Sequence, residues 1–140
     1  MTPQELRARA AAFAVAVNRF CEPFLAKPAV RVAAEQLLRA SASVASNHRA
    51  AGKARSHAEF TAKIAIVDEE ADESVFWLEH LRDCRFVSGT EVEPYLVEAR
   101  ELSAIFTASA KTVRGRESAT RAARRRSGGR HRTDDRERHR

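Results

Sequence analysis

The sequence predicts an all-α protein: an antiparallel up-down-up-down four-helix bundle with a disordered basic C-terminal tail. Two observations support this prediction. Apolar residues recur at the helical period in four long segments of the 140-residue chain. Only five glycines and four prolines are present, so turns are scarce and the elements must be few and long. Apolar residues make up 44% of the chain, which is enough for one core at this length.

The first two helices have clear boundaries in the sequence. Thr2 and Glu5 occupy the two positions of a capping box, so the first helix is expected to begin at Thr2. Pro23 and Pro28 bracket the break that follows, and Gly52 is expected to stop the second helix. The two apolar stripes are Leu6, Ala10, Phe13, Val17, Phe20 and Phe24, and then Val30, Ala33, Leu37, Ala40, Val44, Asn47 and Ala51.

The third and fourth helices follow the same logic. Ser56 and Glu59 form a second capping-box pattern, and the third helix is expected to end near residues 84–86. The fourth helix is expected to follow a turn at residues 88–90, with Pro94 in its first turn, where a missing N–H costs little. Their stripes are Phe60, Ile64, Val67, Ala71, Ser74, Leu78 and Leu81, and then Val92, Leu96, Ala99, Leu102, Phe106, Ala110 and Val113.

The charge of the chain is divided unevenly. Residues 1–113 hold 14 basic and 15 acidic residues, a net of −1, whereas residues 114–140 hold 11 arginines and four acids, a net of +7. The C-terminal segment has no apolar face, so burial cannot offset the entropy of ordering it. The predicted domains are therefore a bundle over residues 1–114 and a disordered arginine-rich tail over residues 115–140.

No segment has the length or hydropathy of a membrane span. The longest apolar run covers residues 10–17, far short of the ~20 residues that a spanning helix needs. No signal-peptide pattern is present, so a cytoplasmic protein is expected. Cys21 and Cys84 lie far apart in the sequence and are expected to be reduced, buried thiols.

Two stretches resemble a known family. They are residues 36–52, which read QLLRASASVASNHRAAG, and residues 59–79, which contain the run IVDEEADESVFWLE. Both are similar to the bacterial four-helix-bundle family that includes proteins encoded in 23S rRNA intervening sequences, and the accessory protein of diversity-generating retroelements is similar to that family. The resemblance covers about residues 5–113. It implies a homopentameric barrel, association with nucleic acid, and an accessory role beside another machine such as a reverse transcriptase.

The sequence contains no pattern typical of an enzyme. Asp68, Glu69, Glu70, Asp72 and Glu73 crowd the third helix, but a ferritin-like di-metal site would need Glu-x-x-His, and the chain has none. HExxH, P-loop and GxGxxG motifs are also missing. The acids are therefore interpreted as surface or subunit-interface partners of arginines. No catalysis, cofactor or metal is expected.

A polar cluster is predicted between the second and third helices. Asn47 lies on an inward stripe, and a buried amide or carboxylate needs hydrogen-bond partners. We expect Ser43, Asn47 and Glu70 to meet, with Glu73 or Arg39 as further members. Such a cluster can set helix register or subunit orientation, and the alternative is a functional pocket.

The aromatic residues and histidines have less specific patterns. Phe60, Phe76 and Trp77 stand at helical spacing among aliphatic neighbours, which favours core or subunit-interface positions over base stacking. The five histidines show no metal-ligand spacing and are expected at the surface.

The arginine tail is the candidate nucleic-acid site. Arginine binds phosphate in a bidentate fashion, and basic segments bind nucleic acid through counterion release. The favoured function is a non-catalytic oligomeric bundle that associates with RNA or DNA. The alternative is a structural or protein-binding scaffold, with no nucleic-acid role, whose tail only solubilises it. The candidate nucleic-acid-binding residues are Arg121, Arg124, Arg125, Arg126, Arg130 and Arg132.

Overall fold

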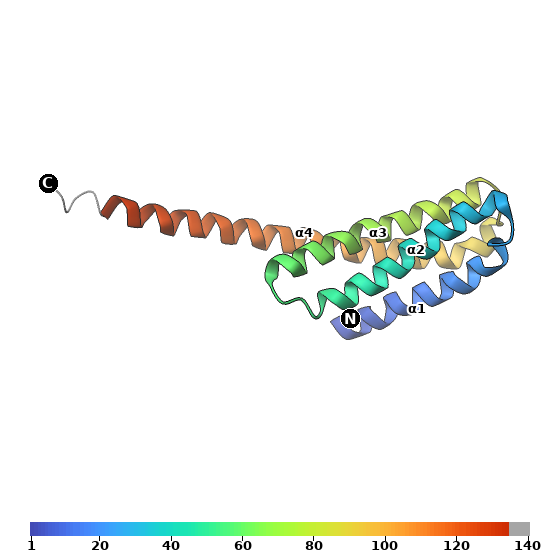
Figure 1. Ribbon diagram of the computed structural model, residues 1–140, viewed down its shortest axis with the longest axis horizontal. Helices are drawn as coiled ribbons and strands as arrows, with labels where there is room; N and C mark the ends of the chain where they lie inside the picture. The colour runs from blue at the N-terminus through green and yellow to red at the C-terminus, as the bar shows by residue number, and fades with distance from the viewer. Residues whose placement is uncertain (135–140) are drawn as a thin grey trace. The chain divides into compact units, whose positions relative to one another are not determined.

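The described part of the chain consists of four α-helices and one short 3-10 helix (Figure 1). The computed structural model describes the backbone of residues 1–134 and the side chains of residues 1–129. It divides into two compact units, Met1–Ala110 and a second that begins at Lys111, and each is described by itself below. The elements are α1 (Pro3–Cys21), η1 (Glu22–Phe24), α2 (Pro28–Ala51), α3 (His57–Asp83) and α4 (Gly89–Asp134).

The first unit is the predicted antiparallel four-helix bundle. The helices alternate in direction, and their apolar stripes meet in one continuous core (Figure 1). The stripes of α2, α3 and α4 are confirmed almost throughout, from Val30 to Val44 in α2 and from Val92 to Ala110 in α4. The stripe residues at the ends of the bundle are only half-buried: Leu6, Phe20, Phe24, Asn47 and Phe60.

The predicted helix starts are confirmed with one difference. At α1 the Thr2 hydroxyl accepts from the Glu5 N–H, and the Glu5 carboxylate accepts from the Thr2 N–H, which is a complete capping box. At α3 the Ser56 hydroxyl accepts from the Glu59 N–H at 3.1 Å. The Glu59 carboxylate, however, accepts from the Arg55 N–H, so this box is made on one side only.

The end of α3 is a Schellman motif with arginine in the left-handed position. Arg85 has φ +60°, a conformation in which glycine is strongly favoured. The Phe86 N–H donates to the Leu81 carbonyl at 3.1 Å, and the Arg85 N–H donates to the Arg82 carbonyl at 2.9 Å. The two hydrogen bonds satisfy carbonyls that the helix end would otherwise leave without partners.

The start of α4 lies earlier than the sequence predicted. The Ser88 hydroxyl accepts from the Glu91 N–H, and the Ser88 carbonyl accepts from the Val92 N–H, so the helix begins at Gly89 inside the expected turn. Pro94 consequently lies inside the helix, in its second turn, and the expectation that it occupies the first turn is wrong. Its missing N–H removes one helical hydrogen bond there.

The two cysteines differ in their surroundings, and both are free thiols. Cys21 is fully buried, and this burial raises the pKa of its thiol to about 12, so the thiol stays protonated. Cys84 is exposed at the end of α3, which corrects the expectation that both thiols are buried. The reason is that Cys84 is the C-cap residue of α3 and lies beyond its last buried stripe residue, Leu81.

The second unit continues α4 to Asp134, where the sequence analysis expected disorder from residue 115. Alanine and arginine both have high helix propensity, and the Arg121 guanidinium pairs with the Glu117 carboxylate one turn earlier at 3.0 Å. Every described residue from Arg114 to Gly129 except Glu117 is exposed, so local propensity and not burial supports this helix. Residues 135–140 lie outside the described part of the chain.

Candidate nucleic-acid interface

The arginine-rich part of α4 carries a dense positive surface. Over residues 111–126 it presents seven exposed basic side chains against one acid, Glu117. Lys111, Arg114, Arg121 and Arg125 follow each other at spacings of 3, 7 and 4, which places them on one face of the helix. This face is about 21 Å long at 1.5 Å per residue, so it can follow several consecutive phosphates of a nucleic acid.

Most of the predicted phosphate ligands lie on this described helix. Arg121, Arg124, Arg125 and Arg126 are all exposed. Arg130 and Arg132 fall within the bounds of α4, and their side chains lie outside what the structure describes. Arg121 is the member that an acid partly neutralises, through its pair with Glu117.

The predicted polar cluster between α2 and α3 divides into two parts. In the first part, Arg39 of α2 bridges two carboxylates of α3, with its Nη1 3.2 Å from the Glu70 carboxylate and its Nη2 on Glu73. Trp77 donates its indole N–H to Glu73 at 3.2 Å. Arg39, which the sequence analysis named only as a possible member, is therefore the centre of this part.

In the second part, Asn47 bonds to its own helix. Its Nδ2 donates to the Ser43 carbonyl at 3.0 Å and to the Ser43 hydroxyl at 2.9 Å. Among the described residues no hydrogen bond joins Asn47 to Glu70, so that predicted contact is wrong. Asn47 is half-buried, and its short side chain finds acceptors one turn back in α2.

The Glu73 carboxylate is the electrostatic centre of the Arg39 part. Burial alone would raise the pKa of Glu73, but the hydrogen bonds from Arg39 and Trp77 outweigh it, and the net pKa lies below the ordinary value. A carboxylate held ionised by a guanidinium and an indole is a structural tie between α2 and α3. It is not a poised acid or base.

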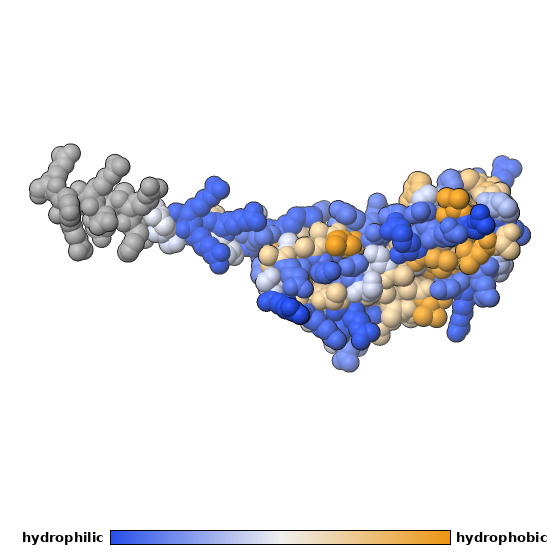
Figure 2. Space-filling model, in the orientation of Figure 1, coloured by the Kyte–Doolittle hydropathy of each residue, from blue (hydrophilic) through white to orange (hydrophobic). Residues whose placement is uncertain are grey.

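Large apolar side chains are exposed on several helices of the bundle. Phe76 is 55% exposed and lies edge-on to Trp77 at 4.9 Å and stacked on His80 at 5.9 Å, measured between ring centroids. Other large apolar side chains of the bundle are also exposed, with Val32 at 62% on α2 and Val97 at 46% on α4. On the face drawn in Figure 2, apolar surface lies mainly toward the end where α1 connects to α2.

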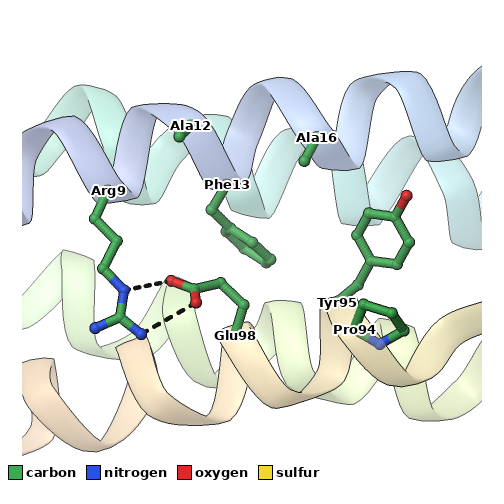
Figure 3. Close-up of a pocket in the computed structure, with 7 residues that line it drawn as sticks. All are labelled: Arg9, Ala12, Phe13, Ala16, Pro94, Tyr95 and Glu98. Carbon is green, nitrogen blue, oxygen red and sulfur yellow. Dashed lines mark hydrogen bonds and ion pairs between the residues drawn. The ribbon is translucent and has the colours of Figure 1, made fainter.

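A groove of about 440 Å³ lies between α1 and α4 (Figure 3). Its apolar lining comes from Phe13 and small residues of α1 and from Pro94 and Tyr95 of α4. One end is closed by an ion pair in which Arg9 Nε lies 2.6 Å from the Glu98 carboxylate. The groove was not predicted from the sequence. The stripe pattern places Arg9 and Glu98 beside the core, but it does not show that they pair.

Among the described residues, no group of three His, Cys, Asp or Glu side chains could hold a metal ion. In the same part of the chain, no helix is both long enough and apolar enough to cross a membrane.

Comparisons with known proteins identify relatives of the bundle. The family model described as the 23S rRNA-intervening sequence protein matches residues 4–108. A crystal structure of a protein of unknown function from the S23 ribosomal protein family of Bacteroides thetaiotaomicron is 25% identical, with a TM-score of 0.70. The match covers 76% of this chain and 98% of that one. None of the curated proteins compared with the chain matches it.

Proposed function

The chain belongs to the 23S rRNA-intervening sequence protein family, and from this premise we propose that it is a non-catalytic, oligomeric bundle that associates with nucleic acid. The observation that carries the proposal is the basic face of α4, with seven exposed basic residues against one acid over residues 111–126. The bundle supports the same assignment to α4, because residues 1–110 hold 13 basic and 15 acidic residues, a net charge of only −2. A nearly neutral bundle offers little long-range attraction for phosphates.

The chemistry of the basic face suits the phosphate backbone better than base edges. Guanidinium groups pair with phosphate oxygens bidentately, and the contact requires no particular base. A cylinder of helical width also fits the major groove of duplex DNA, whereas the major groove of A-form RNA is too narrow. We therefore expect binding with little sequence preference and with a strong dependence on salt.

The test compares two full-length variants that lose the same charge. R121A/R124A/R125A/R126A removes four arginines from the basic face, and R19A/K27A/R31A/R100A removes four basic residues from exposed bundle positions. Arg-to-Ala changes preserve helix propensity, so both variants should keep the far-ultraviolet helical signal. Binding to a labelled duplex and to a single-stranded RNA is followed by fluorescence anisotropy over a series of salt concentrations.

We expect the α4 variant to lose most of its affinity. On duplex DNA, the slope of the logarithm of the binding constant against the logarithm of salt concentration should fall in magnitude by up to about 3.6, since each neutralised phosphate contributes about 0.9. The bundle variant should bind nearly as wild type does. Equal losses in the two variants would show that binding is not confined to α4 and would contradict the assignment. If the wild-type protein fails to bind even at low salt, the nucleic-acid proposal is rejected and the scaffold alternative takes its place.

Self-association is the second part of the proposal. Large apolar side chains of three helices are exposed and would remain in water in a lone bundle: Phe76 of α3, Val32 of α2 and Val97 of α4. The groove between α1 and α4 offers a further apolar surface. Light scattering coupled to gel filtration should give a closed oligomer for the wild type, with a pentamer expected by resemblance. F76S should weaken it, and a wild-type monomer at micromolar concentration would contradict this part.

A further inference from the structure

Two buried nitrogen atoms of the bundle have no hydrogen-bond partner among the described residues. They are Nε of Arg7 on α1 and Nδ1 of His48 on α2, and both are shielded from water. Among the described residues, no hydrogen bond or ion pair involves the Arg7 side chain. A buried polar group left in this state costs about 1–3 kcal/mol, so two of them in one bundle need an explanation.

Arg7 and His48 lie close enough to influence each other. Burial lowers the pKa of His48, and the positive charge of Arg7 lowers it further. The His48 ring also packs against the Phe106 ring of α4, with centroids 5.2 Å apart. His48 is therefore a half-buried, neutral imidazole beside a permanent cation, which corrects the expectation of an ordinary surface histidine.

Gly52 makes room for this arrangement at the end of α2. A Cβ atom at Gly52 would lie 2.4 Å from Nη2 of Arg7, which is too close for any real contact. The backbone of Gly52 is ordinary right-handed helix, so no positive φ demands a glycine. The absence of a side chain there serves to let the Arg7 guanidinium lie against the end of α2.

The surroundings of the pair are basic. No aspartate or glutamate occurs between Gln36 and Ala58, while Arg49, Lys53 and Arg55 do. None of these three makes an ion pair with a described residue. Figure 1 shows the start of α1 beside the end of α2 and its connection to α3, so these charges gather at the end of the bundle that holds Arg7.

We propose that Arg7 and His48 form a binding site for a phosphate-type oxyanion. An oxyanion accepts hydrogen bonds from a guanidinium and from an imidazole N–H together, and its charge offsets that of Arg7. Arg7 and His48 are each only half-buried, so an anion can approach the two side chains from the solvent side. Arg7 Nε and His48 Nδ1 are themselves shielded, so a small rotation of each side chain must accompany binding. Arg49, Lys53 and Arg55 raise its local concentration.

The anion has two sources with the same chemistry, a phosphate of a nucleic-acid backbone or free inorganic phosphate. Only the first source depends on the proposed function. The site lies on the bundle and is separate in sequence from the arginines of α4, so each can fail without the other.

The test uses full-length protein and two readouts. The first is the midpoint of thermal unfolding in phosphate against chloride at matched ionic strength. The second is the titration of the His48 ring followed by NMR. Phosphate should raise the midpoint by a few degrees in a saturable manner, and it should raise the pKa of His48, because the bound anion opposes the effect of Arg7.

Three variants locate the effect. R7M removes the guanidinium and should abolish both responses. G52A displaces the guanidinium from the end of α2 while keeping a backbone conformation that alanine adopts readily. Because the Arg7 side chain is flexible, G52A should weaken both responses without removing them, which keeps the test informative if R7M folds poorly. R19M, an exposed arginine elsewhere on α1, is the matched control and should respond as wild type does.

The source is then read from a titration with a short RNA. If RNA shifts the NMR signals of the His48 ring, and R7M binds the RNA several-fold more weakly, the anion is a phosphate of the nucleic-acid backbone. A response to phosphate alone identifies the free ion, and both results support the site. If phosphate and chloride act alike on the wild type, or if R7M and G52A respond as R19M does, the site does not exist.

Discussion

Arg9 and Glu98 join the first and last helices of the bundle by a bidentate ion pair. Arg9 Nε lies 2.6 Å from one Glu98 oxygen, and Nη2 lies 3.0 Å from the other, along the edge of the groove in Figure 3. Arg9 Nη2 also reaches Glu101 on the next turn of α4. The hydrogen bonds to Glu98 are the largest cause of a raised pKa for Arg9, which burial partly opposes.

We expect this pair to contribute a measurable coupling energy. A double-mutant cycle of Arg9→Met and Glu98→Gln, measured by urea unfolding, should give about 0.5–1 kcal/mol, because bidentate geometry helps while partial exposure screens the charges. Glu101→Gln is the control for the second contact and should couple more weakly, since its side chain is 57% exposed. A coupling energy near zero would show that the ion pair does not stabilise the bundle.

The Arg39 part of the polar cluster should stabilise the bundle in a pH-dependent manner. Arg39→Met should cost about 0.5–1 kcal/mol at neutral pH, a modest value because Arg39 is half-exposed and solvent screens its charge. The folded pKa of Glu73 lies below its unfolded value, so this stabilisation is complete above the unfolded pKa. It is lost as the pH falls through the folded pKa of Glu73.

Chemical denaturation of wild type and Arg39→Met over a range of acidic to neutral pH checks this sign. The two curves should converge at low pH and separate as the pH rises. Curves that stay parallel throughout would mean that Arg39 acts by packing and not by charge.

Asn47 should matter less than an inward position suggests. If Asn47 bonded to Glu70, Asn47→Leu would leave a carboxylate without its partner and cost about 1–3 kcal/mol. Asn47 instead bonds to Ser43, and Glu70 has Arg39, so we expect a loss below about 1 kcal/mol. The measurement is the free energy of unfolding in urea. A loss of about 2 kcal/mol or more would indicate a direct contact between Asn47 and Glu70.

Replacing Arg85 with glycine should make the protein more stable. Arg85→Gly removes the penalty of a left-handed conformation and should stabilise the protein by about 1 kcal/mol, raising the midpoint of thermal unfolding by a few degrees. Arg85→Ala removes the same side chain but keeps a Cβ, so it should give little of this gain. Equal effects of the two substitutions would attribute the change to lost charge.

Much of the bundle was determined by the sequence itself. The 3.6-residue period of apolar residues identified the inward faces, and Thr2 and Ser56 marked helix starts, because caps act within one turn of chain. The division of charge between the bundle and the C-terminal segment is also a property of the sequence alone. The helical state of residues 115–134 was not predicted, because the lack of an apolar face was used as the only criterion. The helix propensity of alanine and arginine acts without burial.

Only the tertiary structure decided which side chains meet. Periodicity gives the face on which a residue lies, but it does not give the axial level at which two helices pass each other. For that reason Glu70 was assigned to Asn47 when its partner is Arg39, and the pair of Arg9 with Glu98 could not be foreseen. The same reason hid the most unusual neighbours in the bundle: Arg7 and His48 are 41 positions apart in the sequence, and only the packing of α1 against α2 brings them together.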